Sequence, residues 1–216
     1  MTQEFEAVAE PGVLTPRMPR DVGARSQRRR VLDALALTCA QKTFAATTIG
    51  DIVTEAKISR ATFYKHFAHK RECFDAAVAA FADELEAAAI DAQKRSDARS
   101  LAVQEAIAAI LDLLAEKPEW ARLVLIDAPI VEPAILGGHR DRVVEGLEAQ
   151  WQRGKGGEHA KADSLIAFGR AHVLIADYLA AGRADQLPKL LPELTYIALL
   201  PFVGHEQALA QDKLAR

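Results

Sequence analysis

The sequence is poor in aromatic residues and in cysteine. Aromatic residues make up 6% of the 216 residues, and the two cysteines are Cys39 and Cys73. A low aromatic content combined with abundant alanine favours helices over a β-sandwich or barrel. Two cysteines do not make the disulfide framework of a small secreted domain, so a reducing, cytoplasmic compartment is expected. Both thiols are expected at buried helical positions; a role in sensing oxidants is the alternative.

Long apolar segments are also missing. The longest candidate, residues 196–203, is short and contains Pro201, so no membrane span and no membrane partner are expected. The N-terminal residues carry acidic groups and prolines instead of an apolar stretch, so no secretory signal peptide is expected. Hydrophobic residues at 50% and charged residues at 26% are the balance of a folded chain with one large domain or two small ones.

Positive charge is concentrated in one part of the chain. Residues 17–71 carry twelve Lys and Arg against four Asp and Glu, a net charge of +8. Residues 72–216 carry fifteen against twenty-three, a net charge of −8, and residues 1–16 add −3. This segregation indicates a module that binds a polyanion, attached to a larger part that does not touch it. A solvated basic helix face is the alternative.

The basic segment contains the pattern of a helix-turn-helix. Apolar residues at helical spacing predict a first helix over residues 27–42. Thr48 followed by Asp51 is a variant of the capping box and predicts the start of a short second helix. Ser59 predicts the start of a third helix, in which Phe63 and Phe67 share one face while basic side chains occupy the other.

The remaining chain predicts only helices. They are expected at residues 70–95, 100–116, 119–126, 134–152, 163–181 and 187–210. Pro129 and Pro133 should interrupt the chain, and Pro192 and Pro201 should kink the last helix or break it. The expected fold is therefore all-α. Its domains are a flexible arm (1–24), a helix-turn-helix domain (25–71) and a larger helical domain (72–216).

A longer motif carries a resemblance to a known family. Its residues are Arg29-x-Val31-Leu32-Asp33-Ala34 and then Phe44-x-x-Thr47-Thr48-Ile49-x-Asp51-Ile52-Val53-x-x-Ala56-x-Ile58-Ser59-x-x-Thr62-Phe63-Tyr64-x-His66-Phe67-x-x-Lys70. This segment resembles the DNA-binding domain of the TetR family of bacterial repressors over residues 28–75. The remainder is similar to the variable regulatory domain of that family only in its size and helical layout.

Three positions depart from the family pattern. Thr43 precedes Phe44 where the family often has glycine, and Lys57 occupies the usual glycine of the turn. A residue other than glycine at a left-handed position implies backbone strain or a different loop. Cys39 stands where phenylalanine is common.

The resemblance implies that residues 59–67 enter the major groove of double-stranded DNA. Arg60 can then pair with guanine or bind a phosphate, and Ala61 and Thr62 can touch a thymine methyl group. Phosphate contacts are expected from the other polar side chains nearby. The complete set of expected DNA-binding residues is Arg28, Arg29, Thr47, Thr48, Ser59, Arg60, Ala61, Thr62, Tyr64, Lys65, His66 and Lys70.

Some of these residues also have a purely structural explanation. Thr48 can simply cap its helix, and His66 can be a packing residue at the helix boundary. The arginine run 28–30 can enter a minor groove, hold phosphates or remain solvated. Phe63 and Phe67 are expected in the core.

The resemblance further implies a homodimer regulated by a small molecule. Residues 165–179 are apolar around the whole helix, which predicts burial on both sides. In the family layout this helix and the last one form a dimer bundle, and an unidentified effector releases the DNA. The candidate effector contacts, each of which can equally be a packing residue, are Trp120, His139, Trp151, Phe168, His172 and Tyr178.

Other functional classes find little support in the sequence. Gly154-Lys155 lacks the spacing of a phosphate-binding loop, and no Gly-x-Ser-x-Gly is present, so no catalytic residues are expected. His66 and His69 lack a third metal ligand nearby, and no metal or cofactor is expected. The remaining alternative is a helical DNA-binding protein without a small-molecule effector.

Overall fold

The structure, a computed structural model, describes residues 20–135, 137–151 and 160–214. Within these ranges all regular structure is helical, which confirms the predicted all-α fold. Most of the expected N-terminal arm, residues 1–19, lies outside the described residues.

The N-terminal part consists of three helices and the start of a fourth. They are α1 (Arg20–Lys42), α2 (Ile49–Glu55), α3 (Arg60–His66) and α4 (Lys70–Gln93). Helix α1 begins at Arg20, seven residues before the predicted start near Gln27. The first turns contain charged residues and Gly23, and Val22 is their one large apolar residue, so the sequence shows no helical periodicity there. No proline stands in these turns to stop a helix.

The larger part begins with α4 and continues through shorter segments. These are α5 (Arg99–Glu116), α6 (Pro118–Arg122), the π-helical turn η1 (Leu123–Asp127), α7 (Ala128–Val131) and α8 (Gly137–Trp151). Pro129 was expected to interrupt the chain, but it lies in the first turn of α7. That position tolerates proline because its N–H has no partner within the helix.

The C-terminal segments are α9 (Ala160–Ala180), the 3₁₀ segment η2 (Ala184–Leu190), α10 (Leu191–Val203) and α11 (His205–Leu214). The expected helix over residues 187–210 is thus broken twice. Pro192 lies in the first turn of α10, while Pro201 lies near its end. The second break comes at Gly204, whose φ of 79° is readily adopted only by glycine.

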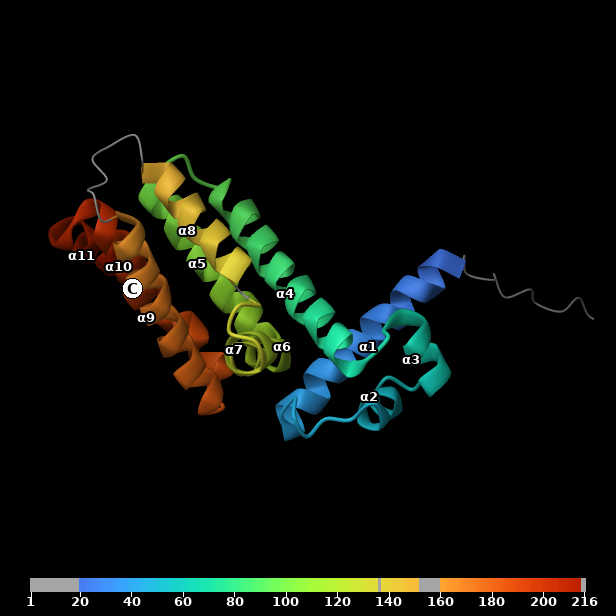
Figure 1. The fold of residues 1–216 in the computed structure, drawn as a ribbon. Helices are drawn as coiled ribbons and strands as arrows, with labels where there is room; N and C mark the ends of the chain where they lie inside the picture. Colours follow the sequence, from blue (N-terminus) through green and yellow to red (C-terminus); the bar gives the residue numbers. More distant parts are fainter. Residues whose placement is uncertain (1–19, 136, 152–159, 215–216) are drawn as a thin grey trace, which may run out of the picture.

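The helices form an elongated molecule with α2 and α3 at one end and α11 at the other (Figure 1). Helix α4 packs along α5, and α10 packs against α5, α9 and α11. One continuous apolar core joins α1 to α4, α5 and α6, with Leu35, Phe74, Phe81, Leu111 and Leu114 among its buried members. The N-terminal helices therefore share a core with the helices that follow them.

The outer face of α9 is exposed in the single chain. Ile166 is 58% and Val173 is 60% exposed, whereas Ile175 and Leu179 are buried. Within one chain α9 is therefore buried on one side only, and the predicted burial of its other side would need a second chain. Beside this face, α9 and α10 border an open groove of about 340 Å³ that includes Ile166, Arg170, Tyr196 and Leu200.

Candidate nucleic-acid interface

Two short helices, α2 and α3, form the predicted helix-turn-helix. The turn between them contains Lys57 with φ 53°, and the loop before α2 contains Thr43 with φ 81°. Both are left-handed positions that favour glycine, so the strain expected from the sequence is present at both. The turn is held by the Ile58 N–H, which donates to the Val53 carbonyl at 3.0 Å.

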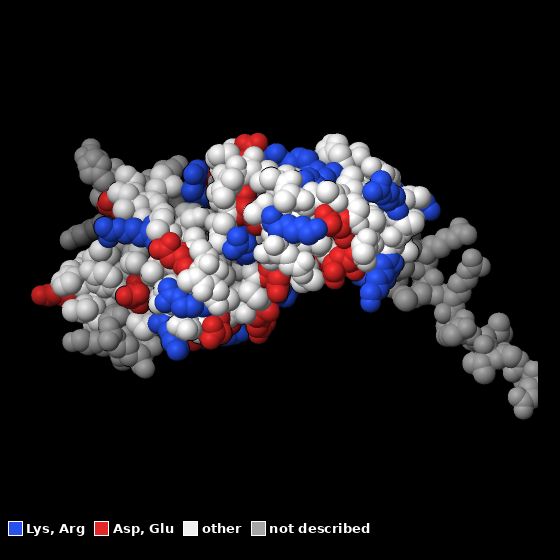
Figure 2. All heavy atoms as spheres, turned by 90° about the horizontal axis from the view of Figure 1, so that it is seen from below, with Lys and Arg blue, Asp and Glu red and all other residues white. Residues whose placement is uncertain are grey.

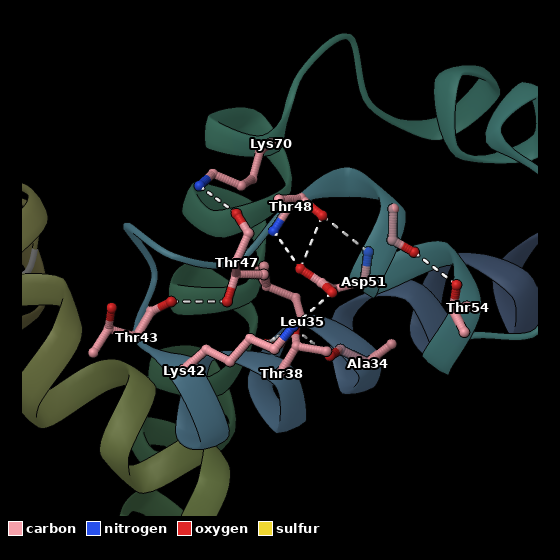
Figure 3. A network of polar contacts seen from close by, with 11 residues as sticks. Ala34, Leu35, Thr38, Lys42, Thr43, Thr47, Thr48, Asp51, Thr54 and Lys70 are labelled. Carbon is pink, nitrogen blue, oxygen red and sulfur yellow. Dashed lines mark hydrogen bonds and ion pairs between the residues drawn. The ribbon is translucent and has the colours of Figure 1, made fainter.

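Helix α2 begins with a complete capping box (Figure 3). The Asp51 N–H donates to Thr48 Oγ1 at 3.1 Å, and the Thr48 N–H donates to Asp51 Oδ2 at 2.9 Å. Lys42 from α1 adds an ion pair with Asp51 at 2.7 Å. The hydrogen bonds from Lys42 and Thr48 lower the pKa of the Asp51 carboxyl to about 2. The cap predicted from Thr48 and Asp51 is confirmed.

Thr47, a predicted DNA contact, faces inward instead. It is 1% exposed, and its hydroxyl donates to the Thr43 carbonyl at 2.8 Å. The backbone N–H of Thr47 donates to the same carbonyl at 3.1 Å. This side chain therefore fixes the strained loop before α2, and the geometry gives it no direct contact with DNA.

Helix α3 presents a polar face outward and an aromatic face inward. Ser59 caps the helix by accepting from the Thr62 N–H at 3.1 Å, as predicted. Phe63 and Phe67 are buried against each other, with ring centroids 5.7 Å apart. The exposed side chains of this segment are Ser59, Arg60, Ala61, Tyr64 and Lys65, while Thr62 and His66 are half-buried.

Two side chains at this surface have neighbours that the sequence did not predict. Gly50 on α2 leaves room for the Arg60 guanidinium, since a Cβ at this position would lie 3.3 Å from Arg60 Nη2. Tyr64 is 55% exposed, and its ring meets the edge of Phe63. The Arg60 guanidinium, expected to pair with guanine or to bind a phosphate, thus lies beside the start of α2.

Two arginines of α1 contact different parts of the molecule. The Arg28 guanidinium lies 5.2 Å from the centre of the Phe67 ring, next to α3. The Arg29 guanidinium pairs with Asp33 at 3.0 Å and lies over the Trp120 ring. Arg29 therefore bridges towards the larger helical part, which makes it a poor candidate for the predicted contact with DNA.

Lys70 also differs from its expected role. Its ammonium group donates to the carbonyl oxygens of Phe44 and Thr47, at 2.7 and 2.6 Å. It lies 4.3 Å from the centre of the Phe44 ring as well. Lys70 therefore holds the loop before α2 to the start of α4, with one ammonium hydrogen left for a phosphate.

Seen from below relative to Figure 1, the molecule shows Lys and Arg side chains interspersed with Asp and Glu (Figure 2). Ion pairs such as Lys42–Asp51 neutralise part of the basic charge of this end. The net positive charge of residues 17–71 therefore does not form a uniform surface, and the uncompensated cations of α3 acquire more importance for attracting DNA.

A family model described as bacterial regulatory proteins of the tetR family matches residues 31–77. Residues 31–77 therefore carry the DNA-binding domain of the TetR family. The match covers α2, α3 and the adjoining parts of α1 and α4, the elements that build the interface described above. A chain with this domain is a DNA-binding transcriptional regulator, and regulators with this domain are in general not enzymes.

Crystal structures of two bacterial regulators have a similar fold. A TetR-like transcriptional regulator from Rhodococcus sp. RHA1 is 21% identical, with a TM-score of 0.66 over 85% of this chain and 98% of that one. A TetR family transcription regulator from Marinobacter aquaeolei VT8 is 18% identical, with a TM-score of 0.67 over 82% and 97%. The likeness in fold thus extends beyond the DNA-binding helices. No curated protein matches the chain.

Among the described residues, the candidate effector contacts do not converge on one pocket. Trp120 on α6 is buried against Phe81, with ring centroids 5.6 Å apart. Phe168 and His172 lie together on α9, with ring centroids 6.5 Å apart, and Tyr178 is covered by the Arg183 guanidinium. The side chain of Trp151 lies outside the described residues.

His139, the last of the candidates, belongs to a charged cluster between α4 and α8. Asp83, Glu86 and His139 present possible metal-ligand atoms within 4.8 Å of one another. The Arg142 guanidinium lies 2.9 Å from Glu86 and 2.6 Å from His139 Nδ1. It lowers the pKa of Glu86 by hydrogen bonding. A cation of the protein thus already stands where a metal ion would bind, and the cluster is best described as an ion-pair network.

No helix in the part of the chain that the structure describes is both long and apolar enough to cross a membrane. Both cysteines are buried, as predicted. Burial raises the pKa of Cys39 to about 11 and that of Cys73 to about 12. Thiols with such values are almost entirely protonated at neutral pH, which disfavours reactions that need the thiolate.

Proposed function

We propose that the chain is a cytoplasmic repressor that binds a near-palindromic operator as a homodimer and is released by a small apolar or aromatic molecule. The domains would be an arm over residues 1–24, of which residues 20–24 form the start of α1, a DNA-binding domain over 25–71 and a regulatory domain over 72–216. The observation that carries the DNA-binding part is the outward face of α3, where Arg60, Tyr64 and Lys65 are exposed beside the capped start of α2.

The two predicted kinds of contact follow from the chemistry of these side chains. The planar fork of Arg60 fits the O6 and N7 acceptors of guanine. Lys65 and Tyr64 can hold phosphates, which set affinity and register without reading sequence. Thr48 and Ser59 are exposed caps whose hydroxyls lie at the same surface.

The exposed apolar face of α9 supports the dimer. Ile166 and Val173 are exposed about two helical turns apart on α9, and Ile166 also lines the groove bordered by α10. Burying such side chains against a second chain removes them from water, which is the main driving force of association. A dimer then carries two α3 helices, and their separation sets the spacing of the operator half-sites.

Support for the effector is the half-buried pair of Phe168 and His172 on α9, whose ring centroids lie 6.5 Å apart. Burial lowers the pKa of His172, so its imidazole is neutral at physiological pH and suits an apolar ligand. The effector would act by favouring a dimer arrangement in which the two α3 helices no longer match the operator.

Selection from a pool of random duplex DNA, followed by sequencing, tests this function. The wild-type chain should enrich a near-palindrome, and Arg60→Ala should relax the preference at one base pair in each half-site. Lys65→Ala should weaken binding to all sequences and reduce the salt dependence by about one counterion. Lys94→Ala removes an exposed charge at the C-terminal end of α4 and is the matched control. It should change neither the sequence preference nor the affinity for DNA and its salt dependence.

Two outcomes would overturn the proposal. Binding without sequence enrichment would leave a nonspecific DNA-binding protein. A screen of apolar and aromatic compounds tests the effector, since a ligand of the folded protein raises its melting temperature. If the operator is found and no compound both stabilises the protein and releases the DNA, the alternative without a small-molecule effector is favoured.

A further inference from the structure

Gly50, in the first turn of α2, is a glycine at a position where the backbone does not require one. Among the described glycines a positive φ occurs at Gly182 and Gly204, whereas Gly50 has an ordinary helical backbone. Glycine loses more conformational entropy than alanine when a helix forms, so it weakens a helix as short as α2. The reason for a glycine here must therefore lie in what surrounds it.

The space beside Gly50 is occupied by a side chain from α3. A Cβ at position 50 would lie 3.3 Å from Arg60 Nη2 and 3.3 Å from Thr48 Oγ1. Both distances are shorter than the spacing of about 3.5–4.0 Å at which carbon atoms make ordinary contact. Arg60 is the first residue of α3, and its guanidinium reaches α2 at the place where a side chain at position 50 would stand.

The Arg60 guanidinium is free to bind a ligand. Arg29 on α1 pairs with Asp33 at 3.0 Å, whereas Arg60 has no ion pair with any carboxylate of the described residues. The carboxylate in the first turn of α2, Asp51, pairs with Lys42 at 2.7 Å instead. Arg60 is also exposed, so its N–H groups remain available as donors at the surface of α2 and α3.

Contact with α2 matters because a free arginine side chain has many rotamers. Ordering such a side chain on binding costs free energy. A guanidinium that already lies against α2 loses less freedom when its planar fork pairs with the O6 and N7 acceptors of a guanine. A Cβ at position 50 would displace Nη2 and disturb this alignment, but it would leave the positive charge of Arg60 in place.

We infer that Gly50 is a specificity-determining residue: because it has no side chain, the Arg60 guanidinium lies against α2 in the orientation that reads a guanine in each half-site. The inference rests on the DNA-binding function proposed above. It goes beyond that function, because it assigns the preference for one base pair to Gly50 and Arg60 together, and Gly50 has no side chain that could contact DNA itself.

The test compares Gly50→Ala, Arg60→Ala and the double variant. Fluorescence anisotropy measures their affinity for the selected operator and for operators changed at the base pair whose preference Arg60→Ala relaxes. Gly50→Ala should reduce the preference for guanine there by about three- to tenfold. It should leave the affinity for unrelated DNA and its salt dependence unchanged, because the charge of Arg60 is retained. In the Arg60→Ala background, adding Gly50→Ala should have no further effect on the preference.

Two control variants separate this role from a general effect on helix starts. Gly138 is also the second residue of its helix, α8, and a Cβ there would lie 3.9 Å from Arg142 Nη1, which is an ordinary contact. Gly138→Ala should therefore leave the base preference unchanged. Thr48→Ala removes the cap of α2 and should weaken binding to every sequence alike, without relaxing the preference.

Thermal unfolding shows that each variant is folded, and Gly50→Ser, which also adds a Cβ, replaces Gly50→Ala if that variant is not. The ¹⁵N relaxation of the Arg60 Nε–H group gives a second measurement without DNA. This group should be more restricted in the wild type and in Gly138→Ala than in Gly50→Ala.

The inference is overturned if Gly50→Ala keeps the wild-type preference, or if it changes the preference equally when Arg60 is absent. It is also overturned if Gly138→Ala or Thr48→Ala relaxes the preference as much as Gly50→Ala, or if Arg60 is equally mobile with and without the added Cβ. A wild-type chain that enriches no sequence would instead contradict the proposed function. In that case the relaxation of Arg60 still decides whether Gly50 positions its guanidinium.

Discussion

The short helices at the DNA-binding end and the long helices of the remainder are stabilised in different ways. The short helices α2 and α3 begin with side-chain caps from Thr48 and Ser59, and the long helix α4, whose start adjoins them, is capped by His69. Helix α5 begins at Ala98 without any side-chain cap and is held by the packing of residues such as Leu111 and Leu114. A seven-residue helix has too few internal hydrogen bonds to form by itself, so it depends on caps and on its neighbours.

The use of caps at one end and of apolar packing in the remainder matches the different tasks of the two parts. The DNA-binding end must hold a few polar side chains at fixed positions, which requires specific polar contacts close along the chain. The larger part must bury apolar faces, which many alanine-rich sequences can do. Substitutions in the two parts should therefore have effects of different size and kind.

The largest effect is expected from the aromatic core under α3. Phe63 is fully buried, so Phe63→Ala should reduce the free energy of unfolding by about 3–5 kcal/mol and abolish DNA binding. Its neighbour Tyr64 is exposed, and Tyr64→Ala should change stability by less than about 0.5 kcal/mol while weakening DNA binding. Urea unfolding measures the stability of the two variants, and operator binding measures their affinity for DNA. Equal losses of stability in the two variants would contradict this arrangement of α3.

Substitutions at the helix caps should have the next largest effect on stability. They directly test the difference between the capped short helices and the uncapped helix α5. Thr48→Ala should cost about 1 kcal/mol, because the Asp51 N–H loses its acceptor. Introducing a cap at the uncapped start of α5, as Ala98→Asp, should stabilise by about 0.5–1 kcal/mol. Thermal unfolding compares the two variants with the wild type. A destabilised Ala98→Asp would show that α5 does not tolerate a cap, and the contrast would then have another cause.

Relieving the backbone strain in the loop before α2 should change stability less than the loss of a cap does, and it should raise stability. Thr43 has a φ of 81°, so Thr43→Gly should relieve left-handed strain and stabilise by up to about 1 kcal/mol, after the greater entropy loss of glycine. A control at a position with ordinary dihedrals, Thr54→Gly in α2, should be destabilising by about 0.5–1 kcal/mol. Loss of stability in both variants would show that the Thr43 side chain contributes more than the strain costs.

The smallest effect is the pH dependence of the cap on α2. The folded pKa of Asp51 is about 2, below the value of about 3.9 expected in an unfolded chain. Its contribution is therefore complete above pH 4 and is lost as the pH falls from 4 towards 2, because the unfolded chain then takes up a proton more readily. Asp51→Asn should show a flatter decline of stability over this range. If Asp51→Asn has the same pH profile of stability as the wild type, the ion pair with Lys42 does not stabilise the protein in solution.

Much of the DNA-binding end could be predicted because its contacts are local. Thr48 with Asp51 and Ser59 with Thr62 are three residues apart, and Phe63 with Phe67 are four apart, so residue type and spacing define each contact. The left-handed positions at Thr43 and Lys57 could be predicted because they depart from glycine in a recognisable motif. Thr47 and Arg29 show the limit of this kind of prediction. The spacing of residues in the motif did not reveal that Thr47 bonds to the Thr43 carbonyl or that Arg29 lies over Trp120.

Beyond these local contacts, the amino-acid sequence by itself determined the helical fold, the caps and the separation of charge, which depend on neighbours within one or two turns. The tertiary structure decided that Arg29 turns to Trp120 and that Lys70 holds Phe44. These contacts join residues far apart in the chain. Their geometry depends on how α1, α4 and α6 pack together, which no periodicity within a single helix encodes.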